Sequence, residues 1–165
     1  MLKIFNSLTN KKEEFKPVRP SRVGIYSCGP TVYDRIHIGN LRAFLLPDLL
    51  QRVIRHVELM DVEWVMNITD IDDKMIKRSQ ESYKDLNPVA ALEELADKYE
   101  EVFLKDLEEV GIKRDDIDHL PRATDFVVQM QEIIKHLLKL EIAYIENGSV
   151  YFSVDRYKAT GKKYG

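Results

Sequence analysis

The chain contains a single cysteine, and it stands in a loop rich in residues that can do chemistry. The loop runs from Cys28 through Gly29-Pro30-Thr31 to His37-Ile38-Gly39-Asn40. A cysteine in such a place is a metal ligand, a nucleophile or a small buried hydrophobe, and an inert buried side chain is the usual case. A loop that follows a strand and opens a helix suits a phosphate, because the exposed amides and the positive end of the helix attract anions.

The stretch His37-Ile38-Gly39-Asn40 predicts contacts to a nucleotide. Glycine at position 39 removes a side chain that would hold a base away from the backbone. His37 is placed to donate to phosphate oxygens as charge builds in a transition state, which is electrostatic stabilisation. Asn40 offers a neutral donor at the helix start. For so short a motif, the alternative is a surface histidine followed by an ordinary helix entry.

Cys28 is the candidate metal ligand. A zinc site needs three or four protein ligands, and the chain has no second cysteine. The remaining histidines do not stand at ligand spacing; they are His56, His119 and His136. If Cys28 binds zinc, its partner ligands are therefore carboxylates or lie outside these residues.

A second polar stretch, Thr69-Asp70-Ile71-Asp72-Asp73-Lys74, follows an apolar run. Thr69 is expected to face the same pocket as the cysteine loop. Helix capping by Asp70 and Asp72 explains most of the acidic residues, so this stretch does not predict a magnesium or general-base site.

The two polar stretches are brought together if the chain forms a parallel βαβ unit. The pattern predicts a buried strand over 23–27, a helix over 39–57 and a second strand over 62–69. Such a crossover is right-handed, and the carboxyl ends of its strands meet at one edge of the sheet. The expected fold class is α/β, with a Rossmann-like parallel sheet.

The flanking segments predict further elements. Short strands are expected over 2–6 and 13–16. Helices are expected over 74–83, 89–110 and 121–140. Asn147-Gly148 favours a tight turn, so 142–145 and 150–154 are expected to form a β-hairpin.

Composition excludes several classes of protein. Hydrophobic residues make up 44% of the 165 residues and the formal net charge is −3, which is typical of a soluble globular chain rather than a strongly basic nucleic-acid binder. These overall values do not exclude a basic patch on part of the surface. No apolar run is long enough for a membrane span, and the N-terminus lacks the features of a secretory signal. A single cysteine agrees with a reducing cytoplasm.

Taken together, these stretches resemble cysteinyl-tRNA synthetase, a class I aminoacyl-tRNA synthetase family. Two stretches carry this resemblance. The family's first signature is matched by Cys28-Gly29-Pro30-Thr31-Val32-Tyr33-Asp34 with His37-Ile38-Gly39-Asn40. Its second is matched by Asn67-Ile68-Thr69-Asp70-Ile71-Asp72-Asp73-Lys74. Weaker matches at Phe5–Thr9, Pro121–Thr124 and Val150–Phe152 extend the resemblance over essentially the whole chain.

The resemblance implies an ATP-dependent ligase that activates cysteine to cysteinyl-adenylate and transfers it to tRNA(Cys). It implies Zn²⁺ as cofactor with Cys28 as one ligand, and ATP as substrate with Mg²⁺. A soft metal separates a cysteine thiolate from a serine hydroxyl. By the same resemblance Gly29, Thr31 and Thr69 bind cysteine. His37, Gly39 and Asn40 match the ATP site, with His37 and Asn40 as its catalytic residues.

Members of that family are much longer. Residues 1–120 resemble the first half of the class I (HUP-type) catalytic domain. Residues 121–165 resemble the start of its connective insertion, a helix and a β-hairpin. We therefore expect this chain to be an N-terminal part of the enzyme that is inactive alone. Its expected partners are tRNA(Cys), cysteine, ATP and the C-terminal half of the enzyme. We expect it to be monomeric and cytoplasmic, without attachment to a membrane. Two alternatives remain at this point: a ligase joining cysteine to an amino sugar, and a non-catalytic binding module derived from a synthetase.

Overall fold

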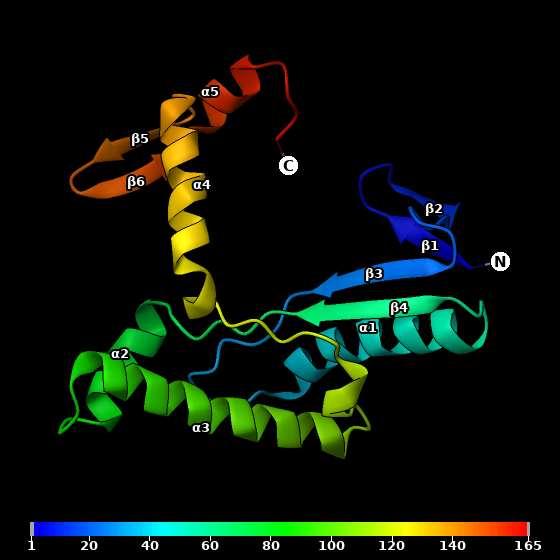
Figure 1. The fold of residues 1–165 in the computed structure, drawn as a ribbon, viewed down its shortest axis with the longest axis horizontal. Helices are drawn as coiled ribbons and strands as arrows, with labels where there is room; N and C mark the ends of the chain where they lie inside the picture. Colours follow the sequence, from blue (N-terminus) through cyan, green and yellow to red (C-terminus); the bar gives the residue numbers. More distant parts are fainter. Residues whose placement is uncertain (1, 165) are drawn as a thin grey trace. The chain divides into compact units, whose positions relative to one another are not determined.

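The computed structural model describes residues 2–164, which form two compact units (Figure 1). The first unit extends to Ala123 and the second begins at Thr124. This division lies beyond residue 120, where the family resemblance puts the boundary, because residues 119–123 pair with β-structure of the first unit. Each unit is described separately.

A parallel strand pair forms the centre of the first unit. Strand β3 (Arg22–Ser27) pairs with β4 (Asp61–Met66), and the register runs from Arg22↔Asp61 to Ser27↔Met66. Helix α1 (Ile38–His56) connects the two strands, and Pro47 lies inside it on the buried side. The predicted strand–helix–strand unit and its parallel pairing are confirmed. Figure 1 shows both arrowheads at the end of the sheet where α1 begins.

A third extended segment lies along the other edge of β4. Met66 N donates to His119 O at 3.0 Å, and Ile68 N donates to Pro121 O at 2.8 Å. Ala123 N in turn donates to Ile68 O at 3.0 Å. The predicted helix start at Pro121 is therefore wrong. Proline suits a first helical turn, but pairing with β4 satisfies backbone groups that the strand would otherwise leave without partners.

The main core lies beneath β4. Trp64 and Met66 of β4 and Ile68, two residues after the strand, follow the same alternation and are completely buried. They belong to one cluster with buried residues of α1 and of α3 (Pro88–Glu109), where Phe44 and Phe103 meet edge to face at 5.2 Å. Helix α2 (Asp73–Ser82) packs along α3. The unit also contains an antiparallel pair formed by β1 (Lys3–Asn6) and β2 (Lys11–Glu14). Its last element is the short 3₁₀ turn η1 (Arg114–Asp116).

One face of β3 is open to solvent. Val23 is buried with Ile54 of α1, whereas Gly24 and Tyr26, which alternate with it, are exposed, Tyr26 by 71%. Parallel sheets are normally covered on both faces. Within the described residues, therefore, this face of β3 lacks the cover that such sheets have.

The second unit is small and mostly exposed. Its elements are η2 (Thr124–Phe126), α4 (Val127–Lys139), β5 (Ala143–Glu146), β6 (Ser149–Phe152) and α5 (Val154–Ala159). The predicted hairpin is confirmed, and Asn147 (φ 49°) and Gly148 (φ 80°) both adopt the left-handed conformation that this tight turn requires. Among its described residues, only Ile142 and Ala143 are buried apolar side chains.

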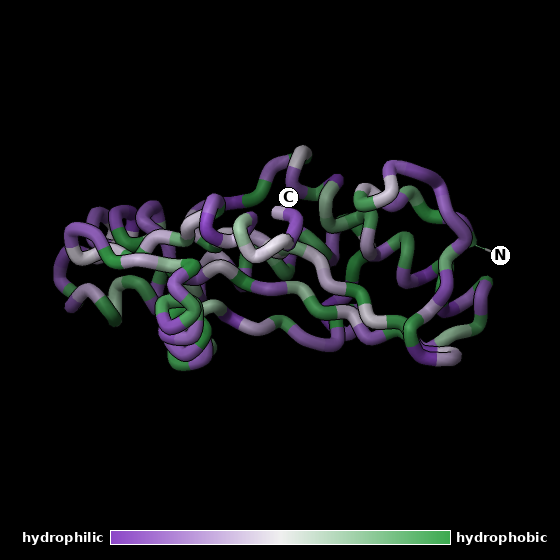
Figure 2. The backbone as a smooth tube through the Cα atoms, turned by 90° about the horizontal axis from the view of Figure 1, so that it is seen from above, coloured by the Kyte–Doolittle hydropathy of each residue, from purple (hydrophilic) through white to green (hydrophobic). Residues whose placement is uncertain are grey.

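Hydrophobic and hydrophilic residues alternate at short range along the backbone (Figure 2). Among residues 2–164, none of the helices combines the length and the apolar composition that crossing a bilayer requires.

Candidate functional site

The carboxyl ends of β3 and β4 are tied together by Asn67, which directly follows β4. Its Oδ1 accepts hydrogen bonds from Gly29 N at 3.2 Å and from the Tyr26 hydroxyl at 3.1 Å. Its Nδ2 donates to Thr69 Oγ1 at 3.2 Å. One amide therefore positions residues of both predicted polar stretches. The sequence reasoning gave Asn67 no role of its own, although a lone amide at the end of an apolar strand is a signal for such a link.

Gly29 lies so close to β4 that no side chain fits there. A Cβ at this position would stand 1.7 Å from the Asn67 carbonyl oxygen and 3.0 Å from the Met66 side chain. Glycine is therefore required by the packing of the loop against the strand end. This packing holds the backbone that follows Cys28 against the end of β4.

The Cys28 thiol is exposed at the end of β3. Its Sγ lies 3.6 Å from the carbonyl oxygen of Gly29, a weak sulfur hydrogen bond. The alternative of an inert cysteine buried in the core is therefore wrong. An accessible thiol is open to a metal, an electrophile or another thiol.

Thr31 and Thr69 lie side by side as a parallel bridge. Thr69 N donates to Pro30 O at 2.9 Å, and Val32 N donates to Thr69 O at 3.1 Å. The loop after β3 thus continues alongside the chain that follows β4, and both threonines are half-buried. Gly29, Thr31 and Thr69, the predicted cysteine-binding residues, are brought into one cluster through Asn67 and this bridge.

His37, Gly39 and Asn40 form the N-terminal cap of α1. His37 Nδ1 accepts from Gly39 N at 3.1 Å, and Asn40 Oδ1 accepts from His37 N at 3.1 Å, which completes a capping box. All three residues are exposed. Because Nδ1 is an acceptor here, the neutral ring carries its proton on Nε2, and Nε2 is the atom left for a ligand.

The space above Gly39 is occupied by the imidazole of His37. A Cβ on Gly39 would lie 2.9 Å from His37 Cε1 and 3.0 Å from Nδ1. In the structure, glycine therefore makes room for a histidine ring of the same chain. Among residues 2–164, no hydrogen bond or ion pair joins this cap to the cluster of Cys28, Gly29, Thr31 and Thr69. The two groups share the end of the sheet where α1 begins (Figure 1).

Two ion pairs tether the loop between these groups. Arg35 Nη2 lies 2.6 Å from Asp106 Oδ1 on α3, and Arg78 Nη1 of α2 lies 3.0 Å from Asp34 Oδ2. The hydrogen bond that Arg35 donates to Asp106 raises the pKa of Arg35. The loop is thus fixed to two helices, which limits the positions its side chains can take.

The described part of the chain does not complete a metal site. No group of three His, Cys, Asp or Glu side chains among residues 2–164 stands close enough to hold an ion. Cys28 fits a metal as a single accessible sulfur ligand, and a closed site requires further ligands.

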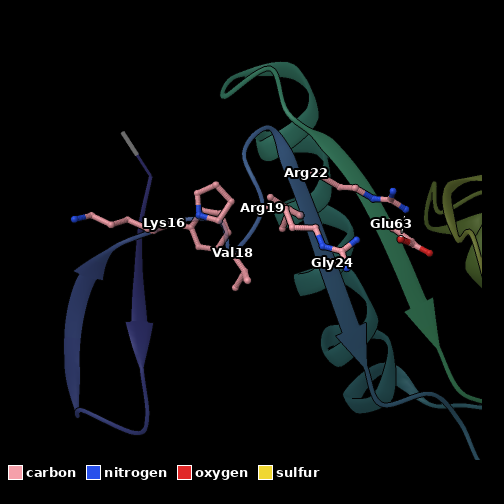
Figure 3. Close-up of a pocket in the computed structure, with 9 residues that line it drawn as sticks. Lys16, Val18, Arg19, Arg22, Gly24 and Glu63 are labelled. Atoms are coloured by element: carbon pink, nitrogen blue, oxygen red, sulfur yellow. Dashed lines mark hydrogen bonds and ion pairs between the residues drawn. The ribbon is translucent and has the colours of Figure 1, made fainter.

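A separate cavity of about 330 Å³ lies beside the first half of β3 (Figure 3). It is lined by Phe15, Lys16, Pro17, Val18, Arg19, Arg22, Val23, Gly24 and Glu63. None of the predicted site residues lines it. It extends over the open face of β3, where Arg22 and Glu63 pair at 2.6 Å.

Comparison with known proteins gives the family. A family model described as "tRNA synthetases class I (C) catalytic domain" matches residues 14–164. A cysteine–tRNA ligase of Brachyspira hyodysenteriae is 44% identical over 158 residues, covering 96% of this chain and 31% of the relative. A cysteine–tRNA ligase of Pyrococcus furiosus is 41% identical over 165 residues, covering 100% of this chain and 33% of the relative.

The chain therefore spans about a third of the length of the curated relatives it matches. The match extends through the parallel strand pair, both polar stretches and the second unit. The chain belongs to the class I (C) tRNA synthetase catalytic-domain family.

Proposed function

We propose that this chain provides the N-terminal part of the catalytic domain of a cysteine–tRNA ligase. The reaction is ATP-dependent activation of cysteine to cysteinyl-adenylate, followed by transfer to tRNA(Cys). The observation that carries the proposal is the accessible Cys28 thiol beside the cluster of Gly29, Thr31 and Thr69, in a chain that belongs to this family. We expect the protein to act as a monomer in the cytoplasm.

The cluster provides the amino-acid pocket. Gly29 keeps the loop backbone close to the strand end, and Thr31 and Thr69 pair in a parallel bridge three residues beyond Cys28 in that loop. Zn²⁺ held by Cys28 and by ligands from the rest of the protein would select a substrate thiolate over a hydroxyl, because a soft metal prefers sulfur. The described residues offer no group of three such ligands, so the others are expected from the rest of the protein.

The cap of α1 provides the ATP site. His37 presents Nε2 and Asn40 presents its amide nitrogen, because the other polar atom of each side chain is occupied in the capping box. Both are donors placed at a positive helix end, where they stabilise charge that develops on the phosphates of Mg²⁺-bound ATP. Their role is electrostatic, so neither has to take up a proton.

The first test is ATP–pyrophosphate exchange with cysteine and zinc. The isolated chain is expected to show no exchange, because it holds one zinc ligand and a third of the relatives' length. A chimera joining this chain to the downstream part of the Brachyspira hyodysenteriae relative is expected to exchange and to charge tRNA. A chimera that exchanges with cysteine but transfers it to an amino sugar instead of tRNA, or that never exchanges, would overturn the proposal.

Cys28→Ser in the chimera tests the metal role. The substitution removes the sulfur with little change in shape, so zinc content and preference for cysteine over serine should fall while the fold is kept. Ser27→Ala at the preceding position, whose hydroxyl accepts from the Trp64 indole at 2.9 Å, is the matched control and should keep its zinc. Unchanged zinc stoichiometry in the Cys28→Ser chimera would count against Cys28 as a ligand.

A further inference from the structure

The extended segment over residues 119–123, here called the edge segment, runs along β4 and past its end to the candidate site. Pro121 O accepts from Ile68 N at 2.8 Å, and Ala123 N donates to Ile68 O at 3.0 Å. Both backbone polar groups of Ile68 are therefore held by the two neighbours of Arg122, the residue that pairs with Ile68 in a parallel bridge. The family resemblance marks this stretch of the sequence, and the proposed function gives Arg122 no role.

Ile68 stands between two residues of the cysteine cluster. Asn67 Nδ2 donates to Thr69 Oγ1 at 3.2 Å, so the side chains on either side of Ile68 are joined. Thr69 N in turn donates to Pro30 O of the loop after β3 at 2.9 Å. This short stretch after β4 is thus held from two sides, by the loop after β3 and by the edge segment.

The Arg122 side chain fastens the edge segment to α3. Its Nε donates to Glu100 Oε2 at 2.7 Å, and its Nη2 lies 2.7 Å both from Glu100 Oε2 and from Asp97 Oδ1. The Glu100 side chain is only 19% exposed, whereas that of Asp97 is 65% exposed, so the pair with Glu100 is the less screened of the two. Burial by itself would lower the pKa of Arg122, but the hydrogen bonds to Asp97 and Glu100, together with their charges, raise it.

The side chain is suited to fixing a position. A guanidinium presents its donors in a rigid plane, so its pair with a carboxylate sets direction as well as distance. A shift of Arg122 would move Pro121 and Ala123, and their two hydrogen bonds would pass the shift to Ile68. From there it reaches Thr69 through the backbone itself. Small displacements of groups that hold a substrate are costly, because the bound geometry has to be kept closely.

We propose that Arg122 is a positioning residue of the cysteine pocket. It holds the edge segment on α3, and through Ile68 it keeps Asn67 and Thr69 in their places in the cluster. Arg122 itself does not contact the substrate. The inference rests on the proposed function, since it takes this cluster as the site that binds cysteine.

Amide hydrogen exchange of the chain itself tests the structural part. Arg122→Ala should speed exchange of the Ile68 and Ala123 amides, because both hydrogen bonds depend on the position of the edge segment. Amides in the middle of α1 report any general loss of stability. The matched control is Arg22→Ala, which removes a single 2.6 Å pair with Glu63 at the opposite end of the strand pair and should leave both amides unchanged. Unchanged exchange of both amides in Arg122→Ala would overturn the proposal.

ATP–pyrophosphate exchange in the chimera tests the functional part. Arg122→Ala should raise KM for cysteine about tenfold, which corresponds to the loss of roughly one hydrogen bond to the substrate. KM for ATP should stay the same, because ATP is assigned to the cap of a different element, α1. Arg22→Ala should leave both KM values unchanged. A role in stability alone would lower kcat through the fraction of folded enzyme and leave both KM values in place, and that result, or an equal rise in Arg22→Ala, refutes the positioning role.

Glu100→Gln carries the same test if Arg122→Ala fails to fold. It keeps the length of the side chain and one acceptor oxygen but removes the charge, so KM for cysteine should rise by less than in Arg122→Ala. In Arg122→Ala/Glu100→Gln the two effects should not add, because both substitutions remove one interaction. Full addition would show that the two residues act separately and contradicts the proposal.

Failure of this inference can be told apart from failure of the proposed function. A chimera that shows no exchange even without substitutions contradicts the function itself. A chimera that exchanges normally, and whose KM for cysteine is the same with Arg122→Ala, contradicts only the positioning role.

Discussion

At the scale of single residues, the contacts around Asn67 explain why the two polar stretches meet. One side chain accepts from Gly29 and Tyr26 and donates to Thr69. The sequence alone identified Gly29 and Thr69 as site candidates through resemblance. It did not show that an amide between them holds both, because a hydrogen bond across strand ends leaves no periodic trace in the sequence.

Gly29→Ala tests this packing. The new Cβ would stand 1.7 Å from the Asn67 carbonyl oxygen, so the loop has to move, at a cost of roughly 1–3 kcal/mol in unfolding free energy. Urea denaturation followed by circular dichroism measures it. The matched control is Gly24→Ala in β3, where a Cβ meets no atom within 4 Å, and there stability should be kept or slightly increased. Equal stability of the two variants would contradict the close approach.

Glu63 gives a pH-dependent contribution to stability. The hydrogen bond from Arg22 at 2.6 Å, helped by one from His119, holds the pKa of Glu63 below its usual range. A carboxyl whose pKa is lowered by folding adds stability above its unfolded pKa and loses it as pH falls through the folded value. Glu63→Gln should therefore lower the urea midpoint at neutral pH and have little effect in strong acid. A deficit that persists in acid would contradict this origin.

At the scale of elements, α1, α2, α3 and α5 each begin at a residue whose side chain caps the helix, whereas α4 has no such cap. Asp72 Oδ1 accepts from Met75 N at 2.7 Å at the start of α2, and Asn87 Oδ1 accepts from Ala90 N at 3.0 Å at the start of α3. Asp72 thus caps the helix start, as predicted. Asp70, for which the same role is predicted, is instead a buried residue two positions before the cap.

Asp72→Ala should cost about 1 kcal/mol of unfolding free energy, because it leaves an amide of the first turn without its partner. Asp72→Asn keeps the acceptor and should retain most of that stability. Thermal unfolding of both variants compares them directly. If the asparagine variant loses as much as the alanine variant, the charge of Asp72 rather than the cap carries the effect.

Periodicity located the elements that depend on local pattern. The central strands, α1, α2, α3 and the hairpin around Asn147-Gly148 all stand within a few residues of their predicted bounds. It failed at residues 119–123, where an amphipathic pattern beginning at Pro121 suggested a helix. Pairing with the far edge of β4 is a long-range interaction, so no local signal reports it. The short helix α5 was missed because its Ser153 cap opens only six residues.

At the scale of the whole molecule, the two units differ in how much they bury. The first has a contiguous core that includes Trp64, Met66 and Ile68, while among described residues of the second only Ile142 and Ala143 are buried apolar side chains. So short a segment with so small a core is below the size at which domains usually fold alone.

The peptide from Thr124 to Gly165 is therefore expected to unfold without a cooperative transition, while the chain ending at Ala123 should keep a sigmoidal one. Circular dichroism during heating measures both. A cooperative transition in the isolated peptide would show that its exposed apolar residues find partners within the segment itself.

The accessible sulfur at the end of β3 also affects how the protein has to be handled. With one thiol per chain, any disulfide between two chains has to join them through Cys28. Such a disulfide would use the Cys28 sulfur, which is the atom proposed to bind zinc. A reductant in the buffer thus protects the proposed metal ligand and keeps chains from being joined through it, and a maleimide dye would mark one known position in every molecule.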